Sequence, residues 1–219
     1  MLPNFRTDMQ AIKEKLTHIG ESLAKANTLV LQGLKTCDEK TFTDARDSVK
    51  NITAKADEID NAIIKVLALY TPEAKDLRQV IAYFKISNEL ARACSNTRSF
   101  IRGFIDVCKD LDTKEINEYA FLMQTSTLKA IQTTVKMINV DDIEELQEMY
   151  EEVIIEENKA DDLYEMIERK LIEEAEGSVT FEKYHKMLKA LRKSEKIANR
   201  AISVADLLLY IKIGGSFHN

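Results

Sequence analysis

Residues that break regular secondary structure are scarce in this 219-residue chain, which has 6 glycines, 2 prolines and no tryptophan. Sheets and hairpins need turn residues at short intervals, so this composition argues against them. Hydrophobic residues make up 45% of the chain and charged residues 31%, a balance that disordered chains do not have. We therefore expect a folded and mostly helical protein.

The chain also lacks a long apolar run, a signal-like start and an excess of positive charge. No run approaches the roughly 18–20 apolar residues that cross a bilayer, and no charged segment followed by an apolar core stands near Met1. The formal net charge of −6 disfavours general binding to nucleic acid, whose phosphates attract basic surfaces. We expect a cytoplasmic protein with no membrane span and no nucleic-acid partner.

Sequence patterns of catalysis and of metal-binding cysteines are missing as well. Cys37, Cys94 and Cys108 are widely spaced and form no Cys-x-x-Cys pair, which favours reduced thiols that help to pack the core over disulfides or a zinc site. No glycine-rich phosphate loop and no nucleophile–base pattern occurs. A di-iron oxidase would need two Glu-x-x-His pairs, and only Glu182 with His185 fits. We expect a protein without enzymatic activity.

What the chain has in abundance is helical periodicity, with apolar residues recurring at alternating steps of four and three. In the first segment these residues run from Phe5 to Val30. Six long helices are predicted, over about residues 5–30, 42–70, 72–108, 113–138, 141–175 and 178–212.

Polar residues at the ends of these segments are typical of helix caps. The predicted caps are Asp38, Thr71, Asp112 or Thr113, Asp141 with Glu144 as a capping box, Ser178 or Thr180, and finally Gly214 with Gly215.

The apolar stripes of the second and third helices match those of the fifth and sixth. Val49 then aligns with Glu157, and Ala91 aligns with Glu195. The third helix is expected to bury Leu77, Val80, Phe84, Ala91, Cys94 and Ile101. We predict an all-α fold of two tandem three-helix bundles with antiparallel helices, the first over residues 1–110 and the second over 111–219.

Two polar pairs interrupt the stripes of the second half. Glu157 and Asp161 stand four residues apart on the fifth helix, as do Glu195 and Asn199 on the sixth. Residues four apart share a helix face, so these oxygen-bearing side chains are predicted to converge. Such ligands suit Mg, Ca, Mn or iron. The alternative is a solvated or salt-bridged flank. The basic residues near in sequence are Lys159, Lys193, Lys196 and Arg200.

The segment "LYTPEAKDLRQVIAYFKISNELAR" resembles the signature of PhoU proteins, which regulate bacterial phosphate uptake. The matching residues are Pro72, Ala74, Asp76, Leu77, Arg78, Lys85, Leu90 and Arg92. The closing segment "SEKIANRAISVADLLLYIKIGG" is similar to the end of the family pattern. Its matching residues are Glu195, Ile197, Ala198, Tyr210 and Gly214. The chain is identified as a divergent member of the PhoU family.

The resemblance implies a cytoplasmic homodimer that regulates phosphate uptake and phosphate-starvation signalling. It would act by contact with the phosphate ABC transporter and its sensor histidine kinase, not by catalysis. The alternatives are a helical scaffold or adaptor for another transporter or signalling system, and a metal-dependent enzyme built on a helical bundle.

The resemblance also implies a divalent metal or iron in the second repeat, at Glu157, Asp161, Glu195 and Asn199, and no other cofactor. The corresponding residues of the first repeat are Val49, Thr53, Ala91 and Ser95. Since these lack carboxylates, at most one occupied site is expected.

Overall fold

The structure, a computed structural model, describes residues 3–105, 108, 114–175 and 181–214 of the chain. These ranges hold the helices α1 (Pro3–Thr36), α2 (Glu39–Ser48), α3 (Ile52–Tyr70), α4 (Ala74–Phe104), α5 (Lys114–Met137), α6 (Ile143–Ala175) and α7 (Phe181–Ile213). They contain no strand, so the prediction of an all-α fold is confirmed. Within them, no helix is both long enough and apolar enough to cross a membrane.

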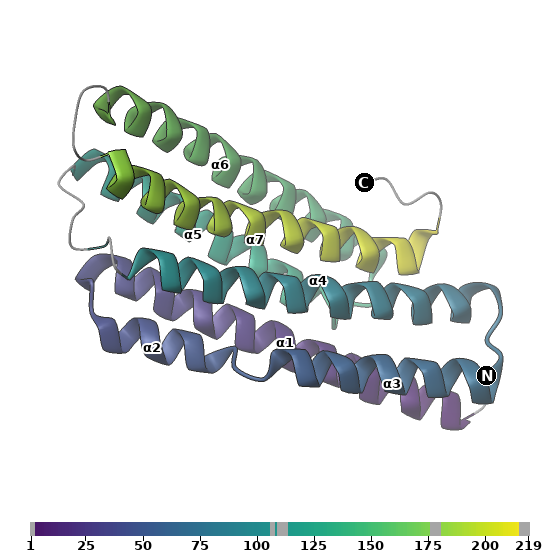
Figure 1. Ribbon diagram of the computed structural model, residues 1–219. Helices are drawn as coiled ribbons and strands as arrows, with labels where there is room; N and C mark the ends of the chain where they lie inside the picture. Colours follow the sequence, from purple (N-terminus) through teal and green to yellow (C-terminus); the bar gives the residue numbers. More distant parts are fainter. Residues whose placement is uncertain (1–2, 106–107, 109–113, 176–180, 215–219) are drawn as a thin grey trace.

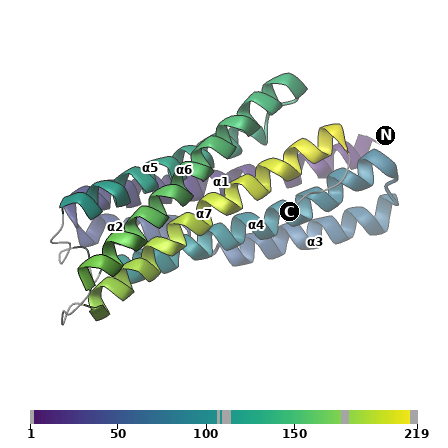
Figure 2. The same ribbon diagram turned by 90° about the horizontal axis from the view of Figure 1, so that it is seen from above.

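The helices form two tandem bundles packed side by side, as predicted (Figure 1). The first bundle contains α1, α4 and the pair α2–α3, which together take the place of one long helix. The second contains α5, α6 and α7. Figures 1 and 2 both show α4 and α7 side by side along the middle of the molecule, and α1 contacts α5 behind them. The two bundles therefore meet along two pairs of helices.

The second predicted helix is broken, which corrects the prediction of one segment over 42–70. Val49 ends α2, where its backbone N–H donates to the carbonyl oxygens of Arg46 and Asp47. Asn51 then adopts a left-handed φ of 63° before α3 begins at Ile52, a conformation that asparagine tolerates better than most residues. Val49 and Ile52 are both buried. The apolar stripe thus continues through the break, so periodicity alone could not reveal it.

The apolar stripe predicted for α1 is confirmed, since every member is buried. The members are Phe5, Met9, Ile12, Leu16, Ile19, Leu23, Ala26 and Val30. Burial of a large aliphatic side chain contributes about 1.5–3 kcal/mol, so this row is a main source of stability. Both hydrophobic clusters of the described residues combine side chains from the first and second bundles. The core is therefore shared between the bundles, and the boundary at residues 110 and 111 stays a prediction.

The stripe predicted for the third helix is partly wrong. Val80 and Cys94 are buried as expected, but Leu77 and Phe84 lie on the surface with 39% of their area exposed. Tyr83, which was outside the predicted stripe, is buried instead. The reason is that α4 packs against α1, α3 and α7, so its buried face is wide. The sequence spacing of its apolar residues therefore cannot tell which of them remain exposed.

A chain of buried polar side chains joins the two bundles at their centre. Asn27 of α1 donates through Nδ2 to Oγ1 of Thr97 on α4 at 3.1 Å. Gln124 of α5 donates through Nε2 to Oδ1 of Asn27 at 3.1 Å, and Ser194 of α7 donates to Oε1 of Gln124 at 2.6 Å. All four side chains are buried. Because unpaired buried polar groups are costly, this network favours one register of the four helices over others.

Two predicted helix starts can be checked against hydrogen bonds. Asp38 caps α2 as predicted, since its carboxylate accepts from the backbone N–H of Thr41 at 2.9 Å. The hydrogen bonds to Thr41, from its hydroxyl and its backbone, hold the pKa of Asp38 below its ordinary value. At the start of α6 the capping residue is Asp142, which accepts from the N–H of Glu145 at 2.9 Å. The predicted capping box of Asp141 with Glu144 is wrong, and Asp141 pairs elsewhere.

The start of α4 also differs from the prediction. Thr71 adopts a left-handed conformation at the end of α3, so it closes that helix and does not cap the next one. Glu73 precedes Ala74, the first residue of α4, without a capping hydrogen bond from its side chain. The end of α7 is as predicted, because Gly214 has a φ of 76° that glycine adopts without steric cost. The caps predicted around residues 112–113 and 178–180, and Gly215, lie outside the described residues.

The expectation of three reduced cysteines is wrong for two of them. Cys37 and Cys108 form a disulfide although 71 positions separate them in the sequence. Cys37 follows the end of α1 and Cys108 follows the end of α4, and these ends lie at the same end of the first bundle. Their proximity is a property of the fold that sequence spacing does not show. Cys94 is a free, buried thiol as expected, and burial raises its pKa to about 12.

Candidate functional site

Glu157 and Asp161 of α6 face Glu195 of α7, which Asn199 contacts. These four residues are called the acidic patch. Glu157 and Asp161 lie one turn apart on α6, and both are half-buried. Burial, followed by the negative charges of Asp161 and Glu195, raises the pKa of Glu157 above its ordinary value. Since Glu195 belongs to α7, the three carboxylates act on one another between the two helices, as the spacing predicted.

Glu195 is the most deeply placed of these carboxylates, with 2% of its surface exposed. Its Oε2 lies 3.2 Å from Nε of Arg192, and its Oε1 accepts a hydrogen bond from Nδ2 of Asn199 at 2.8 Å. Burial nevertheless outweighs these partners and raises the pKa of Glu195. The guanidinium of Arg192 also lies 4.8 Å from the ring centroid of Tyr164 on α6. Arg192 therefore connects the acidic site to both helices.

The oxygen atoms of these residues are suitable ligands for a hard metal ion, but they are not arranged as a metal site. Oδ1 of Asn199 is buried and has no hydrogen-bond partner, which is what an unfilled ligand position looks like, whereas Oε2 of Glu195 is already paired with Arg192. However, within the described ranges no three Asp, Glu, His or Cys side chains come close enough together to hold a metal ion. Arg192 supplies the positive charge nearest to Glu195. Glu157, Asp161, Glu195 and Asn199 therefore share a face but do not form a coordination shell.

Two of the four basic residues expected to neutralise this patch pair elsewhere, while burial raises the pKa of Glu195 and the charge of Lys196 partly offsets that rise. Lys159 donates to Oε1 of Glu156 at 2.9 Å, and Arg200 donates to Oε2 of Glu89 on α4 at 2.8 Å. The partner of Glu195 is Arg192, which the sequence interpretation did not name. Arg192 is three residues before Glu195, so helical spacing alone could have proposed it.

A buried carboxylate that sequence reasoning missed is Glu156, which is 6% exposed. Lys159 and Lys129 lie 2.9 and 3.6 Å from its Oε1. Burial by itself would raise the pKa of Glu156, but hydrogen bonds from Lys159 and Ser126, together with the charges of both lysines, lower it overall. The predicted stripe assigned the buried position to Glu157. Glu156, one residue earlier, faces α5, and only the packing of that helix reveals its burial.

The corresponding positions of the first bundle carry no acidic group. Val49 is buried at the break between α2 and α3, and Ala91 is half-buried on α4. Thr53 and Ser95 are exposed. The first bundle therefore offers no counterpart to the acidic patch.

A second candidate site is the outer face of α4, formed by Leu77, Ile81 and Phe84 (the α4 face). These residues recur at steps of four and three, so they lie on one side of the helix, and each keeps 39% of its surface exposed. Beside Phe84, a groove of about 410 Å³ runs between α4 and α7. Its walls include Lys85, Asn88 and Arg92 from α4, with Ser203 and Leu207 from α7. Contiguous exposed apolar side chains with a polar border are typical of contact surfaces.

The doubled three-helix architecture is that of PhoU proteins, as comparison with solved structures shows. PhoU from Pseudomonas aeruginosa is 20% identical, with a TM-score of 0.86 over 96% of this chain and 100% of that one. The phosphate transport system regulatory protein PhoU from Streptococcus pneumoniae is 15% identical, with a TM-score of 0.83 over 98% and 99%. A PhoU-like protein from Shewanella oneidensis is 15% identical, with a TM-score of 0.64 over 91% and 95%.

The sequence itself supports the same assignment. The family model of the PhoU domain matches residues 16–102, which run from α1 into α4. No curated protein matches the chain. Residues 16–102 match the PhoU domain, and the fold is shared with PhoU structures over nearly the whole chain, so the resemblance noted in the sequence is confirmed.

Proposed function

We propose that this protein is a PhoU-like cytoplasmic regulator of phosphate uptake and phosphate-starvation signalling. It acts by contact with the phosphate ABC transporter and its sensor histidine kinase, as a homodimer and without catalytic turnover. The proposal is supported by the match of residues 16–102 to the PhoU domain and by a fold shared over nearly the whole chain with PhoU structures. One of these is described as a phosphate transport system regulatory protein.

The observation that carries a contact mechanism is the α4 face. A helix that packs on four neighbours still presents Leu77, Ile81 and Phe84 outward, next to a groove that a partner helix can enter. Basic residues border this surface, because Lys85 and Arg92 line the groove. Apolar anchors inside a charged border are the usual composition of a protein interface. We therefore propose the α4 face as the surface that contacts the transporter or the kinase.

A binding assay with purified partners tests this surface. The full-length protein is titrated against the ATPase subunit of the transporter and against the cytoplasmic part of the kinase. Replacement of Ile81 or Phe84 by glutamate should weaken binding about tenfold or more, since each change places a charge in an apolar contact. Ile155→Glu on α6 is the matched control, because Ile155 is also an exposed isoleucine.

The outcomes of this assay separate the proposals. Binding that survives both α4 variants, with unfolding temperatures equal to the wild type, would reject the α4 face. Loss of binding in the Ile155→Glu control would place the interface on α6 instead. A deletion strain that regulates its phosphate-starvation genes normally would reject the regulatory role and favour a scaffold for another system. Light scattering tests the homodimer against a monomer of 25.0 kDa.

Metal binding at Glu157, Asp161, Glu195 and Asn199 stays a proposal that needs its own test. The buried and unpartnered Oδ1 of Asn199 supports it, whereas the pairing of Glu195 with Arg192 and the absence of a formed three-ligand cluster among the described residues weigh against it. Elemental analysis of the purified protein, followed by thermal unfolding with added Mn²⁺ or Fe²⁺, decides between them. A bound metal should raise the unfolding temperature of the wild type, and Glu195→Gln should abolish that rise.

A further inference from the structure

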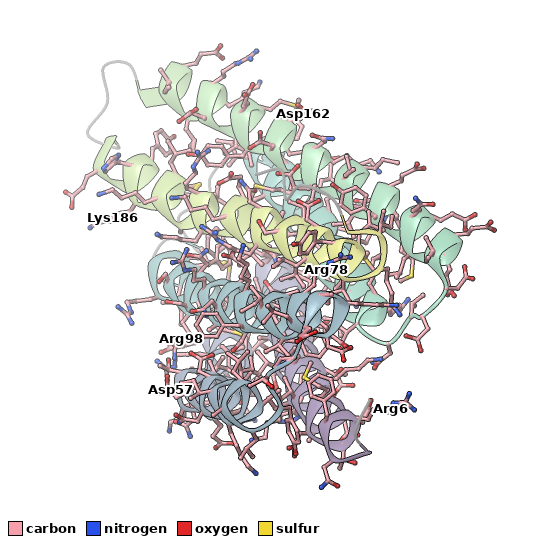
Figure 3. All side chains as sticks on the ribbon, turned by 90° about the vertical axis from the view of Figure 1, so that its right-hand side faces the viewer. Arg6, Asp57, Arg78, Arg98, Asp162 and Lys186 are labelled. Carbon is pink, nitrogen blue, oxygen red and sulfur yellow. A yellow bond between two sulfur atoms is a disulfide. The ribbon has the colours of Figure 1, made fainter. Side chains whose placement is uncertain are left out.

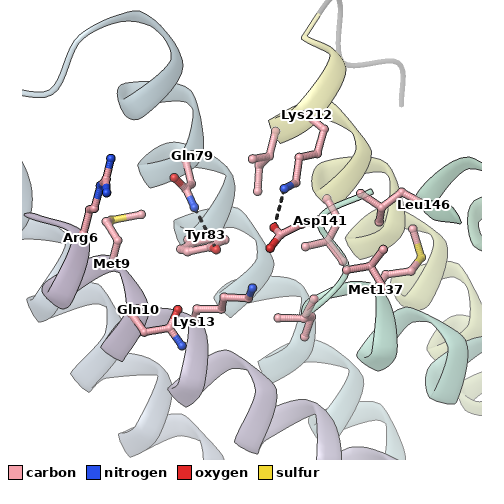
Figure 4. Close-up of a pocket in the computed structure, with 14 residues that line it drawn as sticks. Arg6, Met9, Gln10, Lys13, Gln79, Tyr83, Met137, Asp141, Leu146 and Lys212 are labelled. Atoms are coloured by element: carbon pink, nitrogen blue, oxygen red, sulfur yellow. Dashed lines mark hydrogen bonds and ion pairs between the residues drawn. The ribbon is translucent and has the colours of Figure 1, made fainter. Parts of the chain in front are cut away.

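A cavity of about 550 Å³ opens where the two bundles meet at one end of the molecule (Figure 4). It is lined by residues of α1, α4 and α7, by Met137 at the end of α5, by Leu146 near the start of α6 and by the link between these two helices. Figure 3 views the molecule from this end, with Arg6 projecting from α1 and Arg78 lying between α4 and α7. The volume is within the range of small-molecule sites, about 300–1,000 Å³. The acidic patch and the α4 face contribute none of the lining residues.

The floor of this cavity is apolar. Met9, Met137, Leu146, Leu208 and Ile211 line it, and each of them is almost wholly buried. Two of these are methionines, whose flexible and polarisable side chains adapt to differently shaped ligands. The floor therefore suits the hydrocarbon or aromatic portion of a ligand.

The mouth of the cavity is positively charged although the whole chain carries a net charge of −6. Arg6 and Lys13 of α1 and Lys212 of α7 line it, against one acidic residue, Asp141. Figure 4 shows the ammonium group of Lys13 extending into the cavity between Tyr83 and Asp141. Lys13 and Lys212 come from separate helices and both extend toward Asp141, an arrangement that attracts anions, whereas Arg6 lies farther out.

The carboxylate of Asp141 is itself an oxyanion bound at the mouth of the cavity. Nζ of Lys212 donates to Oδ1 of Asp141 at 2.7 Å. The hydrogen bond and charge of Lys212, followed by the charge of Lys13, hold the pKa of Asp141 below its ordinary value. A ligand with a single carboxylate would only replace the carboxylate of Asp141, which is already paired with Lys212. A doubly charged group gains more from the same cations, because the attraction grows with the charge.

We propose that this cavity binds a small organic phosphate, with the phosphate at Lys13 and Lys212 and the organic portion on the apolar floor. Binding displaces the carboxylate of Asp141 from Lys212. The ligand touches α1 and α4 of the first bundle and α7 of the second, so it ties the two bundles together at this end. The proposal rests on the cavity alone and does not depend on the transporter or the kinase.

Calorimetric titration of the full chain tests the ligand class. The probes are phenyl phosphate, hexyl phosphate and AMP, compared with phenol, 1-hexanol, adenosine and inorganic phosphate. At least one organic phosphate should bind with a dissociation constant below about 1 mM, and about tenfold more tightly than inorganic phosphate and than its uncharged counterpart. If no organic phosphate reaches that affinity, or if the uncharged compounds bind equally well, the proposal is wrong.

Side-chain substitutions and NMR locate the bound ligand. Lys13→Met should weaken binding about tenfold, as expected for the loss of one charge-assisted hydrogen bond, and Asp141→Asn should strengthen it. Lys25→Met, at an exposed lysine on the same helix, should leave the affinity unchanged. With methionine methyl groups labelled, the ligand should shift the signals of Met9 and Met137. Binding that shifts neither signal, or that is unaffected by Lys13→Met, would overturn the proposed site.

Discussion

Replacement of Glu157 by glutamine should stabilise the protein at neutral pH, which is the opposite of what most substitutions at a partly buried position do. Burial and the charges of Asp161 and Glu195 disfavour the ionised carboxylate at Glu157. Glutamine keeps the shape and removes the charge. Relief of one like-charge pair four residues apart gives about 0.2–0.5 kcal/mol, and relief of the partial burial of a charge brings the total to about 1 kcal/mol.

The pH dependence distinguishes this reasoning from a simple packing effect. The pKa of Glu157 in the folded chain lies above its ordinary value of 4.5, so folding favours the protonated form. The wild type therefore loses stability as the pH rises through the folded-state pKa, and below about pH 4.5 the penalty is absent. The advantage of Glu157→Gln should be full at pH 7 to 8 and should vanish near pH 4.

Thermal unfolding by circular dichroism measures this difference. For a chain of this length, about 1 kcal/mol corresponds to about 2–4 °C in the unfolding temperature. Glu151→Gln is the matched control, because Glu151 is an exposed residue of the same helix, and it should change the stability by less than about 0.5 kcal/mol. An advantage that persists unchanged at pH 4, or a Glu157→Gln variant less stable than wild type at pH 7, would refute the argument.

Two further predictions follow from the packing of the bundles. Reduction of the Cys37–Cys108 disulfide, which closes a 71-residue separation, should lower the free energy of unfolding by about 4 kcal/mol in the chain-entropy treatment. Urea unfolding with and without reductant checks this, and a Cys37→Ser variant that is insensitive to reductant is the control. Gln124→Leu should cost about 1–3 kcal/mol in the same assay, because it leaves the buried Oδ1 of Asn27 without its donor and leaves the Ser194 hydroxyl with Thr127 alone. A cost below about 0.5 kcal/mol would contradict the role given to this network.

The acidic patch shows which features the residue spacing predicted and which depended on how the helices pack. The four-residue separations predicted that Glu157 with Asp161 and Glu195 with Asn199 share a face, and, after burial, the charges of Asp161 and Glu195 both raise the pKa of Glu157. The spacing could not show that Arg192 would approach Glu195. Which neighbour a charged side chain selects depends on rotamers and on the facing helix.

The sequence pattern could not predict the α4 face or the cavity, for a related reason. Leu77 and Phe84 were assigned to the core because they fall on an apolar stripe, yet they are exposed. The cavity joins residues as far apart in the sequence as Arg6 and Lys212. Both features depend on where neighbouring helices end and diverge, and helical periodicity carries no information about that.

By itself, the sequence determined the helical class, the doubled plan and most of the α1 core. These follow from the scarcity of turn residues and from the period of the apolar side chains, which are local properties of the chain. The tertiary structure decided the break at Asn51, the pairing of Cys37 with Cys108 and the residues that remain at the surface of α4. Each of these depends on contacts between residues that are distant in sequence, because a buried position is defined by what packs against it.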